Sequence, residues 1–180
     1  MVRRDYSDHM RVITSFDDLE PVPWANGAGE TTELVSLTDS QVLTPALRRW
    51  RLSIARLDRP AEFSPMPGMA RTFLPTGAEV VLEIDGHRHP VTPAEPALFR
   101  GEQKVSLVGL GAPCFALNLM VEINKRLGSG QRGLELSTRF TGTGLFAVTL
   151  DSVPGYPRFQ LLEFEESDVL PDHLGVAVLH

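Results

Sequence analysis

Hydrophobic and polar positions alternate most clearly at residues 50–55 of the chain. In a β-strand, side chains two residues apart point to the same side of the sheet. The two sets of side chains are Trp50, Leu52 and Ile54, and Arg51, Ser53 and Ala55. One face of the predicted strand therefore needs a hydrophobic core, and the opposite face is free to meet solvent or a ligand.

Short apolar stretches separated by turn signals recur along the whole chain. They lie at 34–37, 50–57, 80–84, 97–100, 105–110 and 115–121, with weaker ones at 134–136, 145–150, 159–164 and 176–179. The clearest turn is Asp85-Gly86, a residue pair that suits the type I′ turn of a β-hairpin. No long segment of the sequence has the period of a helix, and residues 38–40 are expected to form a turn. The pattern predicts an all-β sandwich or barrel.

Residues 23–34 combine an aromatic ring, an amide, two glycines, hydroxyls and carboxylates between apolar stretches. Gly27 and Gly29 allow a positive φ or a close approach of other backbone atoms. The alternating residues that follow predict the start of a strand, so this segment is expected to bring polar side chains into a sheet. Trp24 is expected to pin the loop to the protein rather than to cover a ligand.

Two further segments place polar groups beside apolar ones. Residues 63–71 contain two prolines and a glycine, which predict a rigid loop without regular structure, and Arg71 ends it. Asn118 stands alone among the apolar residues of the strand expected at 115–121. A buried amide must be hydrogen-bonded, and either the loop around Asn26 or a ligand would supply its partner.

Four motifs together resemble the HutD/Ves family of small cupin-like proteins. They are P-W-x-N-G-x-G-x-T-x-E at 23–33, W-R-x-S-x-A at 50–55, F-S-x-x-P-G-x-x-R at 63–71 and N-x-M at 118–120. The resemblance covers about residues 13–120. It departs from the usual family pattern at Ala25, where a lysine is common, at Ala28, where a third glycine is common, and at Ala116, where an acidic residue is common.

The resemblance implies an all-β, cupin-like double barrel, that is, a bicupin of the RmlC-like jelly-roll type. Residues 13–180 would form one such unit, with the motifs in residues 13–125 and the strands of the second barrel in residues 126–180. Strands near the N-terminus are expected to complete the second barrel, whereas residues 1–12 are expected to be poorly ordered. A Gly-Ser-Gly break at 128–130 would separate the halves.

The amino-acid composition argues against two classes of binding partner. The chain has 180 residues, of which 42% are hydrophobic and 22% charged, as in ordinary globular proteins. Its formal net charge of −6 and its pI near 5.3 argue against non-specific binding to nucleic acid or to an anionic membrane. The sequence has no long apolar stretch and no signal-peptide pattern, so a cytoplasmic location is expected.

Metal binding is the first chemistry to consider, because many cupins hold a metal with histidines and a carboxylate. His87 and His89 have the H-x-H spacing that puts both rings on one face of a strand, and Glu95 is a candidate third ligand. However, both histidines directly follow the Asp85-Gly86 turn, where side chains are usually solvated. Surface histidines are therefore favoured, and no metal or other cofactor is expected.

Candidate ligand contacts come from the motif residues. Arg51 is expected to clamp a ligand carboxylate through two parallel hydrogen bonds, whereas the other arginines of residues 48–59 are expected to form a solvated charged face. Arg71 either contacts the ligand or braces the backbone. The full set of candidate ligand-binding residues is Asn26, Thr32, Glu33, Arg51, Ser53, Phe63, Arg71, Asn118 and Met120.

The resemblance also implies a link to histidine degradation. The favoured function is non-catalytic binding of a small polar acid, such as formylglutamate or urocanate, in a sensing or flux-limiting role. The alternative is a cupin enzyme acting on a small carboxylate, either through a metal at His87, His89 and Glu95 or without metal through Glu33. Pairing of Glu33 with an arginine is favoured over that catalytic role. A protein-interaction module is a third hypothesis, and the sequence leaves a homodimer open.

Overall fold

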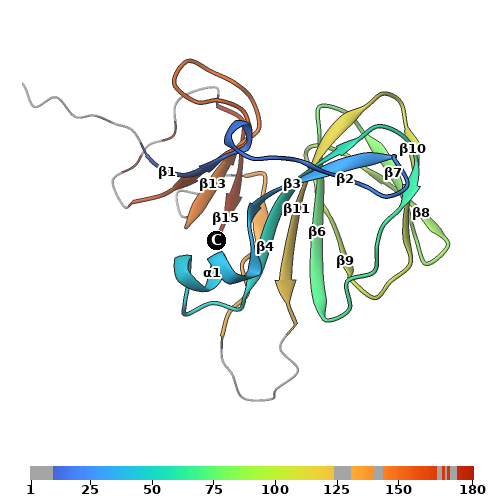
Figure 1. Cartoon of the computed structure of the whole chain (residues 1–180), viewed down its shortest axis with the longest axis horizontal. Helices are drawn as coiled ribbons and strands as arrows, with labels where there is room; N and C mark the ends of the chain where they lie inside the picture. Colours follow the sequence, from blue (N-terminus) through green and yellow to red (C-terminus); the bar gives the residue numbers. More distant parts are fainter. Residues whose placement is uncertain (1–9, 124–130, 140–143, 166–167, 169, 171–173) are drawn as a thin grey trace, which may run out of the picture.

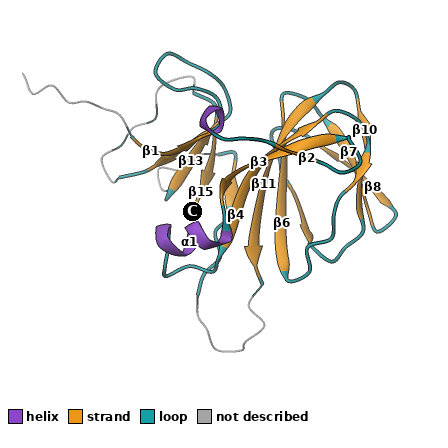
Figure 2. Ribbon diagram, in the orientation of Figure 1, coloured by secondary structure: helices purple, strands orange, loops and turns teal. Residues whose placement is uncertain are grey.

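Three antiparallel sheets, stacked as layers, make up the computed structural model of the chain (Figure 1). The structure describes residues 10–123, 131–139, 144–165, 168, 170 and 174–180. Most of the regular structure in these ranges is β-strand (Figure 2), which confirms the all-β prediction. Over the same ranges, the structure contains no helix whose length and hydropathy would let it span a membrane.

The middle layer is a six-stranded sheet with the order β2-β3-β4-β11-β6-β9. Its strands are β2 (Val22–Pro23), β3 (Gly29–Val35), β4 (Trp50–Leu57), β6 (Met69–Thr76), β9 (Ala97–Arg100) and β11 (Cys114–Glu122). The strand predicted at 50–57 has the observed bounds of β4. It lies between β3 and β11, so both of its edges are hydrogen-bonded within the sheet.

Two smaller sheets cover the two faces of this middle layer (Figure 1). The four-stranded sheet, with the order β5-β10-β7-β8, contains β5 (Ala61–Glu62), β7 (Val80–Ile84), β8 (His87–Val91) and β10 (Val105–Leu110). The five-stranded sheet, with the order β1-β14-β13-β15-β12, contains β1 (Arg11–Ser15), β12 (Leu136–Ser137), β13 (Phe146–Thr149), β14 (Gln160–Glu163) and β15 (Val176–Leu179).

Each face of the middle sheet has its own hydrophobic core. Trp50 and Leu52, both 0% exposed, pack in one cluster with Phe146 of the five-stranded sheet. Phe73 packs in a second cluster with Leu82 of the four-stranded sheet. One sheet therefore supports two sandwiches, as expected for a cupin-like protein with two halves. Among the described residues, no ladder of hydrogen bonds joins the three sheets.

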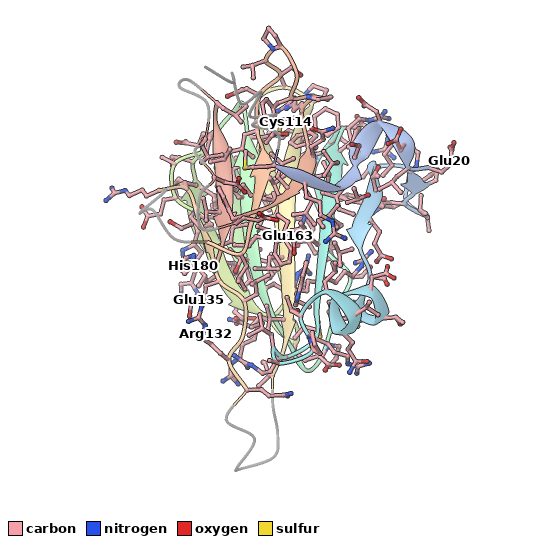
Figure 3. All side chains as sticks on the ribbon, turned by 90° about the vertical axis from the view of Figure 1, so that its left-hand side faces the viewer. Glu20, Cys114, Arg132, Glu135, Glu163 and His180 are labelled. Carbon is pink, nitrogen blue, oxygen red and sulfur yellow. The ribbon has the colours of Figure 1, made fainter. Side chains whose placement is uncertain are left out.

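The N-terminal strand completes the second half of the molecule, as expected. β1 pairs with β14, where the side chains of Arg11 and Glu163 form an ion pair of 2.9 Å. Figure 3 views the protein from this side and labels Glu163. Because β1 begins at Arg11, residues 11 and 12 are part of the sheet rather than poorly ordered. Residues 1–9 and the break expected at 128–130 lie outside the described residues.

The turn between β7 and β8 confirms the hairpin predicted from Asp85-Gly86. Asp85 has a φ of 49° and Gly86 a φ of 82°, and a type I′ turn requires a positive φ at both positions. By contrast, the turn predicted at 38–40 is wrong, because helix α1 (Leu37–Leu43) occupies these residues. At seven residues, α1 is too short to produce a clear helical period in the sequence.

A capping box starts helix α1. The backbone N–H of Asp39 donates to Ser36 Oγ over 3.1 Å, and the backbone N–H of Ser36 donates to Asp39 Oδ2 over 3.4 Å. We expect Ser36→Ala to lower the free energy of unfolding by about 1 kcal/mol, as measured by urea denaturation, because one helix donor loses its acceptor. The control Thr38→Ala, at an exposed position of the same helix, should change it little. Equal losses in both variants would contradict the capping role.

Candidate functional site

A cavity of about 520 Å³ lies in the first half of the molecule, over the face of the middle sheet opposite Trp50. Strands β3, β4, β11 and β6 provide its floor, and the segments before β3 and after β5 provide its rim. Its lining residues are Val22, Trp24, Ala25, Asn26, Thr31, Glu33, Arg51, Ser53, Ala55, Leu57, Glu62, Phe63, Ser64, Met66, Arg71, Phe73, Asn118 and Met120.

Strand register explains how distant residues meet on this floor. Ser53 of β4 lies opposite Glu33 on one side and Asn118 on the other. Met120 of β11 in turn lies between Arg51 and Arg71. Directly paired residues in antiparallel strands project to the same face of a sheet. The alternation that predicted a free face on β4 therefore continues across four neighbouring strands.

Eight of the nine candidate ligand-binding residues line this cavity, and Thr32 is the exception. Thr32 is buried on the opposite face of β3, because it pairs with Ile54, whose side chain is in the other core. Thr31 and Glu33 share the cavity face instead, as the period of two in a strand requires. The alternation of Thr31 with Glu33 in the sequence was the signal that these two residues, and not Thr32, share the cavity face.

Trp24 pins the loop, and its ring also faces the cavity. Its indole N–H donates to Thr31 Oγ1 over 2.8 Å, and this bond ties the loop to β3 as predicted. The ring also lines the cavity. Asn26 follows in the same loop, and its Oδ1 accepts a hydrogen bond of 2.9 Å from the backbone N–H of Ala28. The side chain of Asn26 therefore braces the rim of the cavity.

Two glycines give this rim its shape. Gly27 has a φ of 64°, which most other residues adopt only with strain. A Cβ on Gly29 would lie 2.1 Å from the carbonyl oxygen of Arg56, so only glycine lets β3 approach β4 this closely. The two roles expected of the glycines, positive φ and close approach, are thus divided between them.

Arg71 is the most unusual residue of the cavity. It is only 7% exposed, and its guanidinium lies between the rings of Phe63 and Phe99, 5.3 and 5.1 Å from their centroids. Its hydrogen bonds are long, 3.4 Å from Nη1 to the carbonyl oxygen of Ser64 and 3.5 Å from Nη2 to Asn118 Oδ1. Its buried Nε has no acceptor among the described residues.

No carboxylate of the described residues forms an ion pair with Arg71. Burial lowers the pKa of Arg71 to about 10, with a further lowering by the charge of Arg51. The guanidinium therefore stays cationic at neutral pH although its surroundings disfavour the charge. The loop predicted at 63–71 ends earlier than expected, because β6 begins at Met69 and holds Arg71 on a strand.

Arg51 differs from Arg71 because it has a carboxylate partner. Arg51 Nε donates to Glu33 Oε2, and the two side chains are 26% and 41% exposed. This ion pair confirms the pairing of Glu33 with an arginine. Asn118 and Ser53, 6% and 2% exposed, complete the buried floor near the two arginines. The cavity therefore has one neutralised and one unneutralised guanidinium.

The candidate metal ligands do not form a metal site. His87 and His89 are exposed on β8, an edge strand of the four-stranded sheet, and share a surface depression with Glu95. Nevertheless, the described residues contain no group of three histidine, cysteine or acidic side chains placed to hold a metal ion. This depression is also separate from the cavity, since no residue lines both.

We expect the double variant His87→Ala, His89→Ala to keep the melting temperature and the ligand response of the unmodified protein. Exposed side chains beside a turn contribute little to stability, and neither ring reaches the cavity. Thermal denaturation with and without a carboxylate ligand measures both quantities. Elemental analysis of the two proteins is the control. A tightly held metal that only the unmodified protein retains would contradict this expectation.

Comparison with known proteins agrees with the fold and the motifs. A family model described as HutD matches residues 16–144. The protein Ves of Citrobacter koseri is 35% identical over 111 residues, which are 57% of this chain and 55% of that protein. The chain thus matches about half the length of this relative.

Solved structures are similar in fold over nearly the whole chain. HutD from Pseudomonas fluorescens SBW25, from a formate condition, has a TM-score of 0.58 at 22% identity and covers 95% of this chain and 93% of its own. A conserved protein of unknown function from Pseudomonas aeruginosa PAO1 has a TM-score of 0.65 at 21% identity and covers 95% and 91%. Because the family model matches well over half of the sequence, the chain belongs to the HutD family.

Proposed function

We propose that the protein binds a small carboxylic acid in this cavity, without covalent chemistry, and that Arg71 is its main anchor. The observation that carries the proposal is the buried guanidinium of Arg71, which forms no ion pair with a described residue. A buried charge without a counter-ion is costly, and truncation of one partner of a buried pair typically costs several kcal/mol for the same reason. A ligand anion would remove this cost.

The hydrogen bonds of Arg71 favour the same function. Bonds of 3.4 and 3.5 Å are at the weak end of the range, whereas a guanidinium and a carboxylate normally meet at about 2.7–2.9 Å. A carboxylate next to Arg71 would thus replace two poor acceptors by two strong ones. Asn118 and Ser53 line the same part of the cavity and offer further polar groups.

The biological role in this proposal comes from the family. HutD membership supports a role in histidine degradation, in which a cytoplasmic protein would sense or limit flux by binding a pathway acid. Formylglutamate and urocanate are the ligand types that the sequence resemblance implies, and both carry a carboxylate.

Acid–base catalysis through Glu33 is the competing function. Glu33 lines the cavity, but its carboxylate is engaged by Arg51. The other carboxylate of the lining, Glu62, has a side chain that is 74% exposed and lies near Lys104. A buried pair of carboxyl groups with separate acid and base roles is therefore lacking among the described lining residues. Incubation of the protein with each acid, followed by NMR, would detect turnover and would contradict pure binding.

Thermal denaturation with matched ligands tests the proposal. A ligand at one hundred times its dissociation constant should stabilise the folded protein by about 2.7 kcal/mol. We expect urocanate to raise the melting temperature, whereas its carboxamide, which has the same shape and no negative charge, should not. Equal shifts with the acid and the amide would show that the cavity does not recognise a carboxylate.

A further inference from the structure

The described lining of the cavity contains equal numbers of positive and negative side chains. Four charged side chains belong to its described lining, the cations Arg51 and Arg71 and the anions Glu33 and Glu62. Arg51 and Glu33 already neutralise one another. Glu62 pairs with Lys104 over 3.7 Å, so among the described lining residues Arg71 alone keeps an uncompensated charge. The lining therefore has one vacant position for a negative charge.

Most of the uncharged lining residues are apolar. Phe63 and Phe73 are in ring contact, with centroids 5.6 Å apart, and Phe63 also covers Arg71. Trp24, Met66 and Met120 supply further aromatic or thioether surface. Such walls stabilise an apolar or planar ligand body by burying its surface. They offer no partner for a second charge.

We infer that the cavity selects monocarboxylates with an uncharged, largely apolar body and disfavours dicarboxylates of the same size. This inference rests on the proposed function and specifies its ligand class. When one carboxylate occupies Arg71, a second would find no free cation among the described lining residues, because Glu33 already engages Arg51. The carboxylate of Glu62 at the rim pairs with Lys104, 3.7 Å away, so it leaves no free positive charge there either. The desolvation of an unpaired second anion opposes that arrangement.

The rival arrangement is a two-arginine site. In it, the second carboxylate of a dicarboxylate would take Arg51 from Glu33, and the partly exposed Glu33 would turn to solvent. The two arrangements predict opposite preferences. A pair of ligands that differ only in the second charge distinguishes them directly.

The test measures dissociation constants for N-formylglutamate and N-formylglutamine by titration calorimetry. These compounds have the same size, and the amide replaces one carboxylate. We expect N-formylglutamine to bind at least about tenfold more tightly, because it avoids a second unpaired anion in the cavity. Preferential binding of N-formylglutamate would overturn the inference and support the two-arginine site.

A variant that adds a positive charge at the rim of the cavity provides a second test. Ala25 is exposed and lines the rim, so Ala25→Lys adds one cation there without disturbing the buried floor. We expect Ala25→Lys to reduce or reverse the preference for N-formylglutamine over N-formylglutamate. Ala25→Met, whose side chain has a similar length and no charge, should keep that preference. An unchanged ratio in Ala25→Lys would also count against the charge argument.

Failure of the inference remains distinguishable from failure of the proposed function. If N-formylglutamate binds more tightly and Arg71→Met abolishes binding of both compounds, Arg71 is still the anchor and only the selectivity is wrong. If neither compound nor urocanate binds, or if Arg71→Met binds them normally, the proposed function itself fails and the inference fails with it.

Discussion

Replacing Arg71 by methionine is expected to weaken carboxylate binding roughly a hundredfold or more and, at the same time, to make the protein more stable. The loss of binding follows because the ligand anion would be buried without its cation. The gain in stability follows because Arg71 is only 7% exposed and has no carboxylate partner in the described structure. Replacing buried charged groups by well-packed apolar ones often stabilises a protein by about 1–4 kcal/mol.

Opposite signs of the two effects make this prediction specific. Titration calorimetry would measure the binding, and urea denaturation without ligand would measure the stability. Arg71→Lys should recover only part of the affinity, since an ammonium group cannot present two parallel donors. Arg56→Met is the matched control, because Arg56 is exposed and pairs with Glu30 and Asp58 outside the cavity. An Arg71→Met protein that is less stable and still binds would make Arg71 a structural brace.

Changes to the Arg51–Glu33 ion pair are expected to act in opposite directions on carboxylate affinity. Arg51→Ala should weaken binding by about 1–2 kcal/mol, because it leaves the negative charge of Glu33 uncompensated in the cavity. Glu33→Gln should strengthen binding about tenfold, because it removes that negative charge and frees Arg51 for the ligand. Both values come from calorimetric titration with urocanate.

The double variant tests whether the pair acts as a unit. If Arg51 matters chiefly because it neutralises Glu33, the combined variant should bind better than Arg51→Ala alone, which a double-mutant cycle would report as coupling. Weaker binding by Glu33→Gln would instead place Glu33 in direct contact with the ligand as a hydrogen-bond acceptor. That result, together with turnover of the ligand, would favour the acid–base alternative.

The sequence predicted the bounds of five strands but missed β6, whose first residues fall in the predicted loop at 63–71. The bounds of β4, β7, β9, β10 and β15 agree with their predicted ranges. The alternation of apolar and polar residues placed Arg51 and Ser53 on a common face of β4, which lines the cavity. Helix α1 was missed because its two turns are too short for a periodic signal, and its start depends on a local capping box.

The sequence could not predict that the two arginines have different surroundings. Arg51 lies in an alternating strand and looked like the anchor, yet Glu33, 18 positions away in the chain, neutralises it. Arg71 followed a proline-rich segment and looked like the end of a loop, yet β6 begins before it. Its burial depends on Phe63, Phe99 and Asn118 from three separate segments. Such contacts arise only from tertiary packing, which no local pattern encodes.

NMR of the Arg71 side chain would show whether a carboxylate binds to this guanidinium. Arg71 Nε is buried and has no acceptor among the described residues. When urocanate is titrated into nitrogen-15-labelled protein, a carboxylate at Arg71 should shift the Nε–H resonance downfield and slow its exchange with solvent. The resonance is assigned by its absence from Arg71→Met. We expect the shift to saturate with the same dissociation constant as the calorimetric titration. Saturable binding of urocanate with an unmoved Arg71 signal would contradict this expectation.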